Sequence, residues 1–137
     1  MKIYDFVYID DCEPDYLIFL EVLEELNFKG NVKRLVDGEL GHEFLLQLKQ
    51  AEKKPKLIIL DLNMPILHGM DLLKIIKMDE FLRTIPVIIM SSSEYEKDIQ
   101  NSYFNYANSY IVKPDDYDSL LKTMECIINY WFKIVKL

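Results

Sequence analysis

The residues best suited to chemistry in this 137-residue chain are polar side chains that directly follow short apolar runs. Asp61 follows the apolar residues 57–60. Taken alone, an aspartate after a strand is usually a turn or capping residue. Three other apolar runs, however, are followed in the same way, by Asp10-Asp11, by Ser91 and by Lys113. This joint occurrence is hard to explain by capping, so it predicts one shared functional site.

The residue types in this set have complementary chemistry. Carboxylates that lie close together repel one another, and a divalent cation bound by oxygen ligands offsets that repulsion. Mg²⁺ suits such a site because it takes one or two carboxylates and keeps several waters. A lysine supplies a further positive charge, and a serine hydroxyl can donate a hydrogen bond to an oxyanion. A nucleophile, a metal ion, a cation and a donor are the components that hold and transfer a phosphoryl group.

The elements that must position these residues alternate along the chain between β-rich apolar runs and segments with helical spacing. Parallel strands need crossover connections, so the alternation predicts an α/β fold of the (βα)5 type. In such a doubly wound, parallel, five-stranded sheet, helices cover both faces and ligands bind at the carboxyl ends of the strands. Strands are expected over residues 3–9, 32–36, 57–60, 86–90 and 109–112, and helices over residues 14–26, 44–48, 70–78, 94–106 and 116–134.

Composition narrows the possible functions. The length suits one domain, and half of the residues are hydrophobic, which allows a buried core. The net charge of −7, without any basic block, argues against binding to nucleic acid. Cys12 and Cys126 form no metal-ligand motif and are expected to be reduced thiols. The chain shows neither a signal peptide nor the roughly 18 uninterrupted apolar residues of a membrane span, so a soluble cytoplasmic protein is expected.

The ordered motifs resemble the CheY-like receiver domains of bacterial response regulators, whose fold is flavodoxin-like. The resemblance rests on four segments, which are Asp10-Asp11, Asp61-Leu62-Asn63-Met64-Pro65 with Gly69 beyond it, Pro86-Val87-Ile88-Ile89-Met90-Ser91, and Tyr110-Ile111-Val112-Lys113-Pro114. It covers essentially residues 1–137, so we expect a single receiver domain with no output domain. Output would then pass through contacts with partners.

The resemblance implies a role for each matched residue. Asp61 would be the phosphoacceptor, Lys113 would contact the phosphoryl oxygens, and Ser91 would be the switch residue that moves to the new phosphate. The Mg²⁺ site would consist of Asp11 as a direct ligand, Asp10 acting through water, Asp61, and the backbone carbonyl of Asn63.

Three further expectations concern the backbone and the second switch position. Tyr110 would be the switch aromatic residue and would rotate into the space behind Ser91. The bond Lys113-Pro114 would be cis, as it is in the family and as the tertiary amide permits. Tyr106 stands where the family commonly has glycine, and because a tyrosine with positive φ is strained, we expect a slightly different helix end there.

The resemblance also implies partners. A sensor histidine kinase or a histidine phosphotransfer domain would donate the phosphoryl group, and the face formed by residues 94–134 would change its partner preference. Apolar residues near the end of the chain predict a possible homodimer through this region. Features such as Ser91-Ser92-Ser93 and Tyr130-Trp131-Phe132 point to a stand-alone subgroup, similar to the partners of phytochrome-type and hybrid sensor kinases.

Three alternatives remain to be weighed. An aspartyl-phosphate phosphohydrolase would need a second acid two residues after the nucleophile, where Asn63 cannot exchange a proton. A flavodoxin-like FMN carrier would need a Ser-, Thr- or Gly-rich loop, whereas Asp10-Asp11-Cys12-Glu13 would repel phosphate. The presence of Asp61, Asp11, Ser91 and Lys113 argues against a receiver that no longer takes phosphate. A signalling protein that catalyses only its own phosphorylation and slow autodephosphorylation is therefore expected.

His68 is expected to be an exposed loop residue.

Overall fold

The computed structural model describes residues 2–137 and contains one five-stranded parallel sheet with strand order β2-β1-β3-β4-β5. This order confirms the predicted doubly wound (βα)5 architecture. The strands are short, with bounds Phe6–Ile9 (β1), Val32–Leu35 (β2), Leu57–Leu60 (β3), Val87–Ser91 (β4) and Ser109–Val112 (β5). β1 begins later than expected because Ile3 is exposed and the backbone N–H of Asp5 bonds to the Asn31 carbonyl ahead of the strand.

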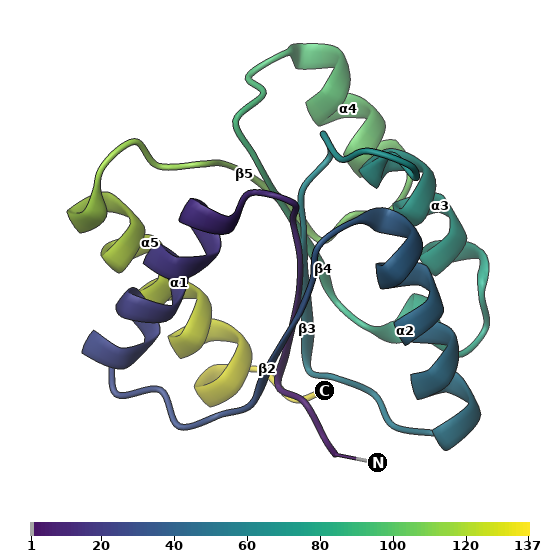
Figure 1. The fold of residues 1–137 in the computed structure, drawn as a ribbon, viewed down its shortest axis with the longest axis horizontal. Coiled ribbons are helices and arrows are strands. Elements are labelled where there is room, and N and C mark those ends of the chain that lie inside the picture. Colours follow the sequence, from purple (N-terminus) through teal and green to yellow (C-terminus); the bar gives the residue numbers. More distant parts are fainter. Residues whose placement is uncertain (1) are drawn as a thin grey trace.

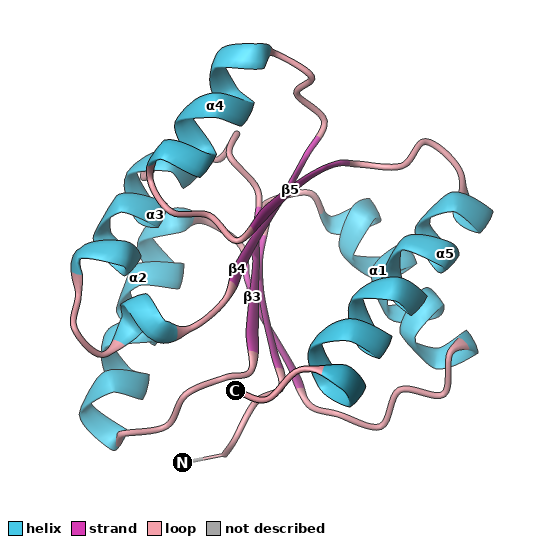
Figure 2. Cartoon of the chain, turned by 180° about the vertical axis from the view of Figure 1, so that it is seen from behind, coloured by secondary structure: helices cyan, strands magenta, loops and turns pink. Residues whose placement is uncertain are grey.

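The two faces of the sheet are covered by different helices (Figures 1 and 2). Helices α1 (Glu13–Glu25) and α5 (Tyr117–Ile128) lie on one face. Helices α2 (Gly38–Ala51), α3 (Gly69–Met78) and α4 (Glu96–Phe104) lie on the other. Strands β1, β3 and β4 are buried along their whole length, which explains why their sequences are continuously apolar. Along the described residues, no helix combines the length and apolarity that a bilayer span requires.

The end of the chain turns back onto the start of the sheet. After α5, residues Asn129–Ile134 form a wider, π-helical turn. The ring of Phe132 lies 5.0 Å from that of Phe6 and 5.4 Å from that of Phe28, measured between centroids. The expected apolar C-terminal surface is therefore only partly present, since Phe132 belongs to the core while Ile134 and Leu137 are exposed.

The end of α4 corrects one expectation. Tyr106 has φ of 69°, in the left-handed region that usually takes glycine, so the expected change in the helix end is wrong. Two hydrogen bonds explain why the backbone keeps this shape. The N–H of Tyr106 donates to the Tyr103 carbonyl, and the N–H of Ala107 donates to the Ser102 carbonyl, each at 2.9 Å. This is the Schellman pattern, and it holds the tyrosine in a strained conformation at a surface position.

Candidate functional site

The carboxyl ends of the strands bring the predicted acidic residues together. Asp10 and Asp11 follow β1, and Asp61 follows β3, the neighbouring strand. One carboxylate oxygen from each of the three lies within 4.8 Å of the others. Asp10 and Asp61 are buried and Asp11 is exposed. The cluster is thus fixed on its inner side and open to solvent on its outer side.

Backbone hydrogen bonds extend the sheet past the strand ends and fix these residues. The N–H of Asp61 donates to the Ile9 carbonyl at 3.0 Å, and that of Asp10 donates to the Leu35 carbonyl at 3.1 Å. At the other side of the site, the N–H of Lys113 donates to the Ser91 carbonyl at 2.8 Å. The site residues therefore have the rigidity of the sheet rather than that of free loops.

Asp61 is the least satisfied polar group of the site. Only 6% of the residue is exposed, and its Oδ1 has no hydrogen-bond partner within residues 2–137. Its Oδ2 lies 3.6 Å from Lys113 Nζ. Burial raises the pKa of the Asp61 carboxyl; the Lys113 ammonium opposes this shift and the Asp10 carboxylate adds to it, so the pKa stays above its ordinary value. A buried acceptor without a donor is suited to an additional cationic or electrophilic group.

Asp10, in contrast, is well satisfied. Its Oδ1 accepts the backbone N–H of Cys12 at 2.9 Å, and its Oδ2 accepts from Lys113 Nζ at 2.9 Å and from the Tyr8 hydroxyl at 3.4 Å. Burial, reinforced by the Asp10 carboxylate, raises the pKa of Tyr8, which therefore stays a neutral donor. Asp10 is thereby held in one orientation, with less capacity left for a direct ligand bond than Asp11 or Asp61.

The cluster fits a divalent metal ion. Hard cations such as Mg²⁺ take carboxylate oxygens and water, and the exposed Asp11 and the unpartnered Asp61 Oδ1 offer both a protein ligand set and access for water. Asn63, whose carbonyl was the fourth predicted ligand, lies in the exposed loop two residues beyond Asp61. These residues would hold the ion.

Lys113 is held by a carboxylate that sequence reasoning missed. Its Nζ lies 2.8 Å from Asp15 Oδ2, closer than to Asp61. Burial acts to lower the pKa of Lys113, but its hydrogen bonds to Asp15 and Asp10 outweigh burial and raise it. The only sign of this role in the sequence is the position of Asp15 in the first turn of α1, where an acidic residue usually stabilises the helix through its dipole.

The two predicted switch residues meet at one loop. Ser91, the last residue of β4, is fully buried, and its Oγ accepts the N–H of Ser93 at 3.2 Å. The hydroxyl of Tyr110, in β5, donates to the Ser93 carbonyl at 2.8 Å. The hydroxyl of Ser93 in turn donates to Asp98 in α4 at 2.6 Å. Ser93 thus connects both switch positions to helix α4.

The predicted cis bond is wrong. Every peptide bond across residues 2–137 is trans, including Lys113-Pro114. The trans form is the lower-energy isomer of an X–Pro bond by about 0.5–1 kcal/mol.

The loop after β3 depends on close packing at Gly69. A Cβ added there would lie 2.1 Å from the Asp61 carbonyl oxygen and 2.6 Å from Leu62 Cα, so no side chain fits. His68, just before it, is exposed, as predicted, and its Nδ1 accepts the Met70 N–H at 3.2 Å as the N-cap of α3.

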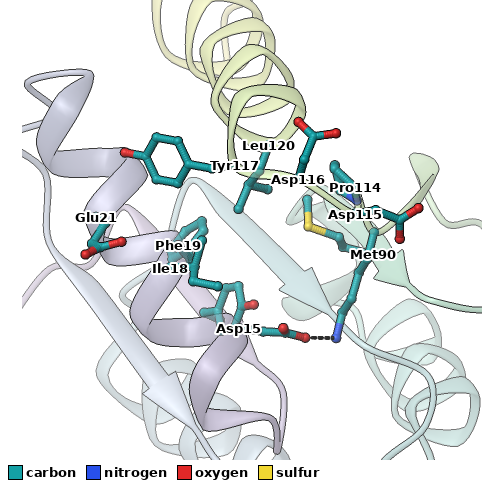
Figure 3. Close-up of a pocket in the computed structure, with 12 residues that line it drawn as sticks. Asp15, Ile18, Phe19, Glu21, Met90, Pro114, Asp115, Asp116, Tyr117 and Leu120 are labelled. Carbon is teal, nitrogen blue, oxygen red and sulfur yellow. Dashed lines mark hydrogen bonds and ion pairs between the residues drawn. The ribbon is translucent and has the colours of Figure 1, made fainter.

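A cavity of about 380 Å³ lies beside the site, between α1 and the start of α5 (Figure 3). Its apolar wall includes Phe19, Met90 and Leu120, and its polar wall includes Asp15 and Lys113. The ion pair between Asp15 and Lys113 therefore forms the boundary between this cavity and the acidic cluster.

Fold and site together define the class of the protein, which is that of the CheY-like α/β domains with an acidic cluster at the carboxyl ends of β1 and β3. Residues 7–125 match the family described as "Response regulator receiver domain". The chain belongs to this family of two-component signalling domains, which are phosphorylated on an aspartate.

Three relatives are similar over nearly the whole chain. The probable methanogenesis regulatory protein FilR2 of Methanothrix harundinacea is 32% identical over 90% of this chain and 80% of its own. The response regulator Rcp1 of Synechocystis is 32% identical over 94% of this chain and 89% of the Rcp1 chain. The crystal structure of the Mn²⁺-bound form of response regulator Rcp1 aligns with this chain over 98% of each chain, with a TM-score of 0.84 and 30% identity. The phosphorylated cyanobacterial phytochrome response regulator RcpA covers 99% of both chains with a TM-score of 0.90 at 30% identity. The predicted likeness to phytochrome-type regulators is confirmed.

Proposed function

We propose that this chain accepts a phosphoryl group on Asp61 from the phosphohistidine of a sensor histidine kinase or phosphotransfer domain, in a Mg²⁺-dependent reaction. The observation that carries the proposal is the buried Asp61 Oδ1, which has no partner within residues 2–137 yet lies beside two further carboxylates and a lysine. The phosphorylated RcpA and the Mn²⁺-bound Rcp1 support it by similarity.

In the proposed reaction, a carboxylate oxygen of Asp61 attacks phosphorus. The P–N bond to the donor imidazole breaks, and its electron pair remains on the ring nitrogen. The product is a mixed anhydride on Asp61, and the Lys113 ammonium compensates charge on the phosphoryl oxygens. A divalent cation at Asp10, Asp11, Asp61 and the Asn63 carbonyl would supply further charge compensation. Because Asn63 cannot act as a general acid, hydrolysis would be slow.

Phosphorylation would then act on the loop that Ser91 and Tyr110 share. The phosphoryl group adds about 1.5–2 negative charges and three acceptor oxygens. The Ser91 hydroxyl would turn from Ser93 to donate to the phosphate, and Tyr110 would move with that loop. The face of α4, β5 and α5 would thereby change its partner preference, for which a coupling of about 1–3 kcal/mol suffices.

We further propose that residues 1–137 act as one receiver domain in the cytoplasm, where Cys12 and Cys126 stay reduced, and signal through protein contacts without binding nucleic acid or membrane. Homodimerisation through the face of α4, β5 and α5 is one such contact. Phe104 at the end of α4 is 80% exposed, which supports this surface. Light scattering of Phe104→Glu and wild type, with and without acetyl phosphate, tests it; equal monomeric masses throughout would reject the dimer.

The phosphoacceptor is tested with acetyl phosphate or a phosphorylated kinase, followed by intact-protein mass spectrometry. The wild type should gain one phosphoryl group in Mg²⁺ and none in EDTA, and Asp61→Asn should gain none. Asp71→Asn, an exposed carboxylate of α3, is the matched control and should behave as wild type. Equal phosphorylation of Asp61→Asn would reject the assignment.

A further inference from the structure

Lys113 contacts three carboxylates, and the proposed phosphoacceptor is the most distant of them. Its Nζ lies 2.8 Å from Asp15 Oδ2 and 2.9 Å from Asp10 Oδ2, within hydrogen-bond distance, but 3.6 Å from Asp61 Oδ2. In this state, the lysine is therefore bonded to the first turn of α1 rather than to Asp61.

Asp15 lies outside the metal-binding cluster. Its side chain is 39% exposed, and it projects from α1 along the wall of the α1–α5 cavity, where its ion pair is drawn as a dashed line (Figure 3). It therefore holds the lysine from α1 and is not one of the three carboxylates of the acidic cluster.

Phosphorylation would place a second demand on the same ammonium group. Phosphorylation of Asp61 adds about 1.5–2 negative charges next to Asp10 and Asp11. Lys113 is the cation that the site contributes to offset this charge, and a charge-assisted hydrogen bond needs a separation of about 2.7–2.9 Å. Two of the three ammonium donors already bond to Asp15 and Asp10, so a shift of Nζ toward a phosphoryl oxygen on Asp61 would weaken the bond to Asp15.

We propose that Asp15 is a positioning residue that retains Lys113 on α1 in the unphosphorylated protein, so that phosphorylation transfers this lysine from Asp15 to the phosphoryl group. The inference rests on the proposed function of Asp61. Asp15 then opposes the phosphorylated state, and the loss of its cation on phosphorylation passes the signal to α1 and to the cavity beside it. This route is separate from the one through Ser91, Tyr110 and α4.

The test uses beryllofluoride, a phosphoryl mimic, titrated at saturating Mg²⁺ with side-chain and backbone NMR shifts as the signal. Asp15→Asn should raise the apparent affinity by about two- to fivefold, the range expected for a partly exposed ion pair. Glu21→Gln is the matched control, because Glu21 lies on the same helix and lines the same cavity but has no ion pair to Lys113 within residues 2–137. It should leave the affinity unchanged.

Two further variants separate the retention of the lysine from other effects. In a Lys113→Met background, Asp15→Asn should give no gain; a gain of the same size there would show that Asp15 acts by its charge alone and would overturn the proposal. Asp15→Glu keeps a carboxylate and should restore affinity to within twofold of wild type, whereas a gain as large as that of Asp15→Asn would also overturn it.

The possible failures are distinguishable. A wild type that binds beryllofluoride with the same affinity as Asp15→Asn rejects the role of Asp15 and leaves the function of Asp61 intact. A wild type that binds none, and takes no phosphoryl group from acetyl phosphate, rejects the proposed function and this inference with it.

Discussion

Neutralising Asp61 should make the metal-free protein more stable. The raised pKa of Asp61 means that its ionised form is less favourable in the folded than in the unfolded state. Asp61→Asn keeps the size and shape of the side chain but removes the buried charge. We therefore expect this variant to unfold at a higher temperature than wild type at pH 7 in EDTA.

The magnitude follows from the distances in the site. At an effective dielectric constant of about 20, the carboxylates of Asp10 and Asp61, which lie within 4.8 Å of each other, repel by at least about 3.5 kcal/mol. The Asp61 carboxylate lies 3.6 Å from the Lys113 ammonium, and this pair attracts by about 4.6 kcal/mol. These two contributions nearly cancel, and repulsion from the solvent-screened Asp11 reduces the remainder. What is left is the cost of burying a charged oxygen, Oδ1, that has no partner, and replacing it by a neutral amide atom is expected to recover about 1–3 kcal/mol. For a chain of this length, that corresponds to a rise of about 3–10 °C in Tm.

The assay is thermal unfolding followed by circular dichroism, with urea unfolding to obtain the free energy. Glu43→Gln, an exposed carboxylate of α2, changes the net charge by the same amount and should stay within about 0.5 kcal/mol of wild type. Adding Mg²⁺ should stabilise wild type more than Asp61→Asn and so reduce the difference, because binding to the folded state raises its stability.

The pH dependence of the stability difference between Asp61→Asn and wild type tests this reasoning. The destabilisation is fully present above the raised pKa of folded Asp61, and it disappears as the pH falls through that pKa toward the ordinary aspartate value of about 4. The difference between the variant and wild type should therefore shrink on acidification. If Asp61→Asn is no more stable than wild type at pH 7 in EDTA, or if the difference grows on acidification, the reasoning about this site is wrong.

Two further predictions concern stability away from the site. Tyr106→Gly removes a left-handed conformation that costs roughly 1–2 kcal/mol, and because glycine loses about 0.5–1 kcal/mol in chain entropy, we expect a net gain of about 0.5–1 kcal/mol in urea unfolding. Tyr106→Ala keeps the strained Cβ and should give no gain; equal gains from both variants would contradict the strain. Phe132→Ala removes the ring that contacts Phe6 and Phe28 and should destabilise by about 2–3 kcal/mol, below the range for fully buried rings. Ile134→Ala at an exposed position is its control, and equal effects of the two variants would show that the C-terminal turn is not part of the core.

Much of the fold follows from the sequence because the three central strands, β1, β3 and β4, are buried on both faces. Continuous apolar runs such as residues 57–60 mark these strands without ambiguity, and the polar residue after each run then lies at the shared edge of the sheet. The clustering of Asp10, Asp11 and Asp61, and the position of Lys113 beside them, were therefore predictable.

The features that the sequence could not predict are those that depend on contacts between distant segments of the chain. Asp15 and Lys113 are 98 positions apart, and their pairing requires the first turn of α1 to face the end of β5. The strained Tyr106 is held by hydrogen bonds of the backbone, which any residue can make. Phe132 packs against the core only because the π-helical turn brings it back to Phe6. No local pattern carries this information.

The return of the C-terminal turn to the start of β1 has a consequence for spectroscopy. Trp131, the single tryptophan, lies in that turn and packs on the cluster around Phe6, at the amino ends of the strands. The acidic site lies at the opposite ends of the same strands. Tryptophan emission in this protein should therefore report unfolding and should respond little to the binding of an ion or a phosphoryl group. An optical titration of the site would need a fluorophore placed near the loop after β4, for instance on Ser92→Cys in a chain whose free thiols Cys12 and Cys126 are replaced by serine.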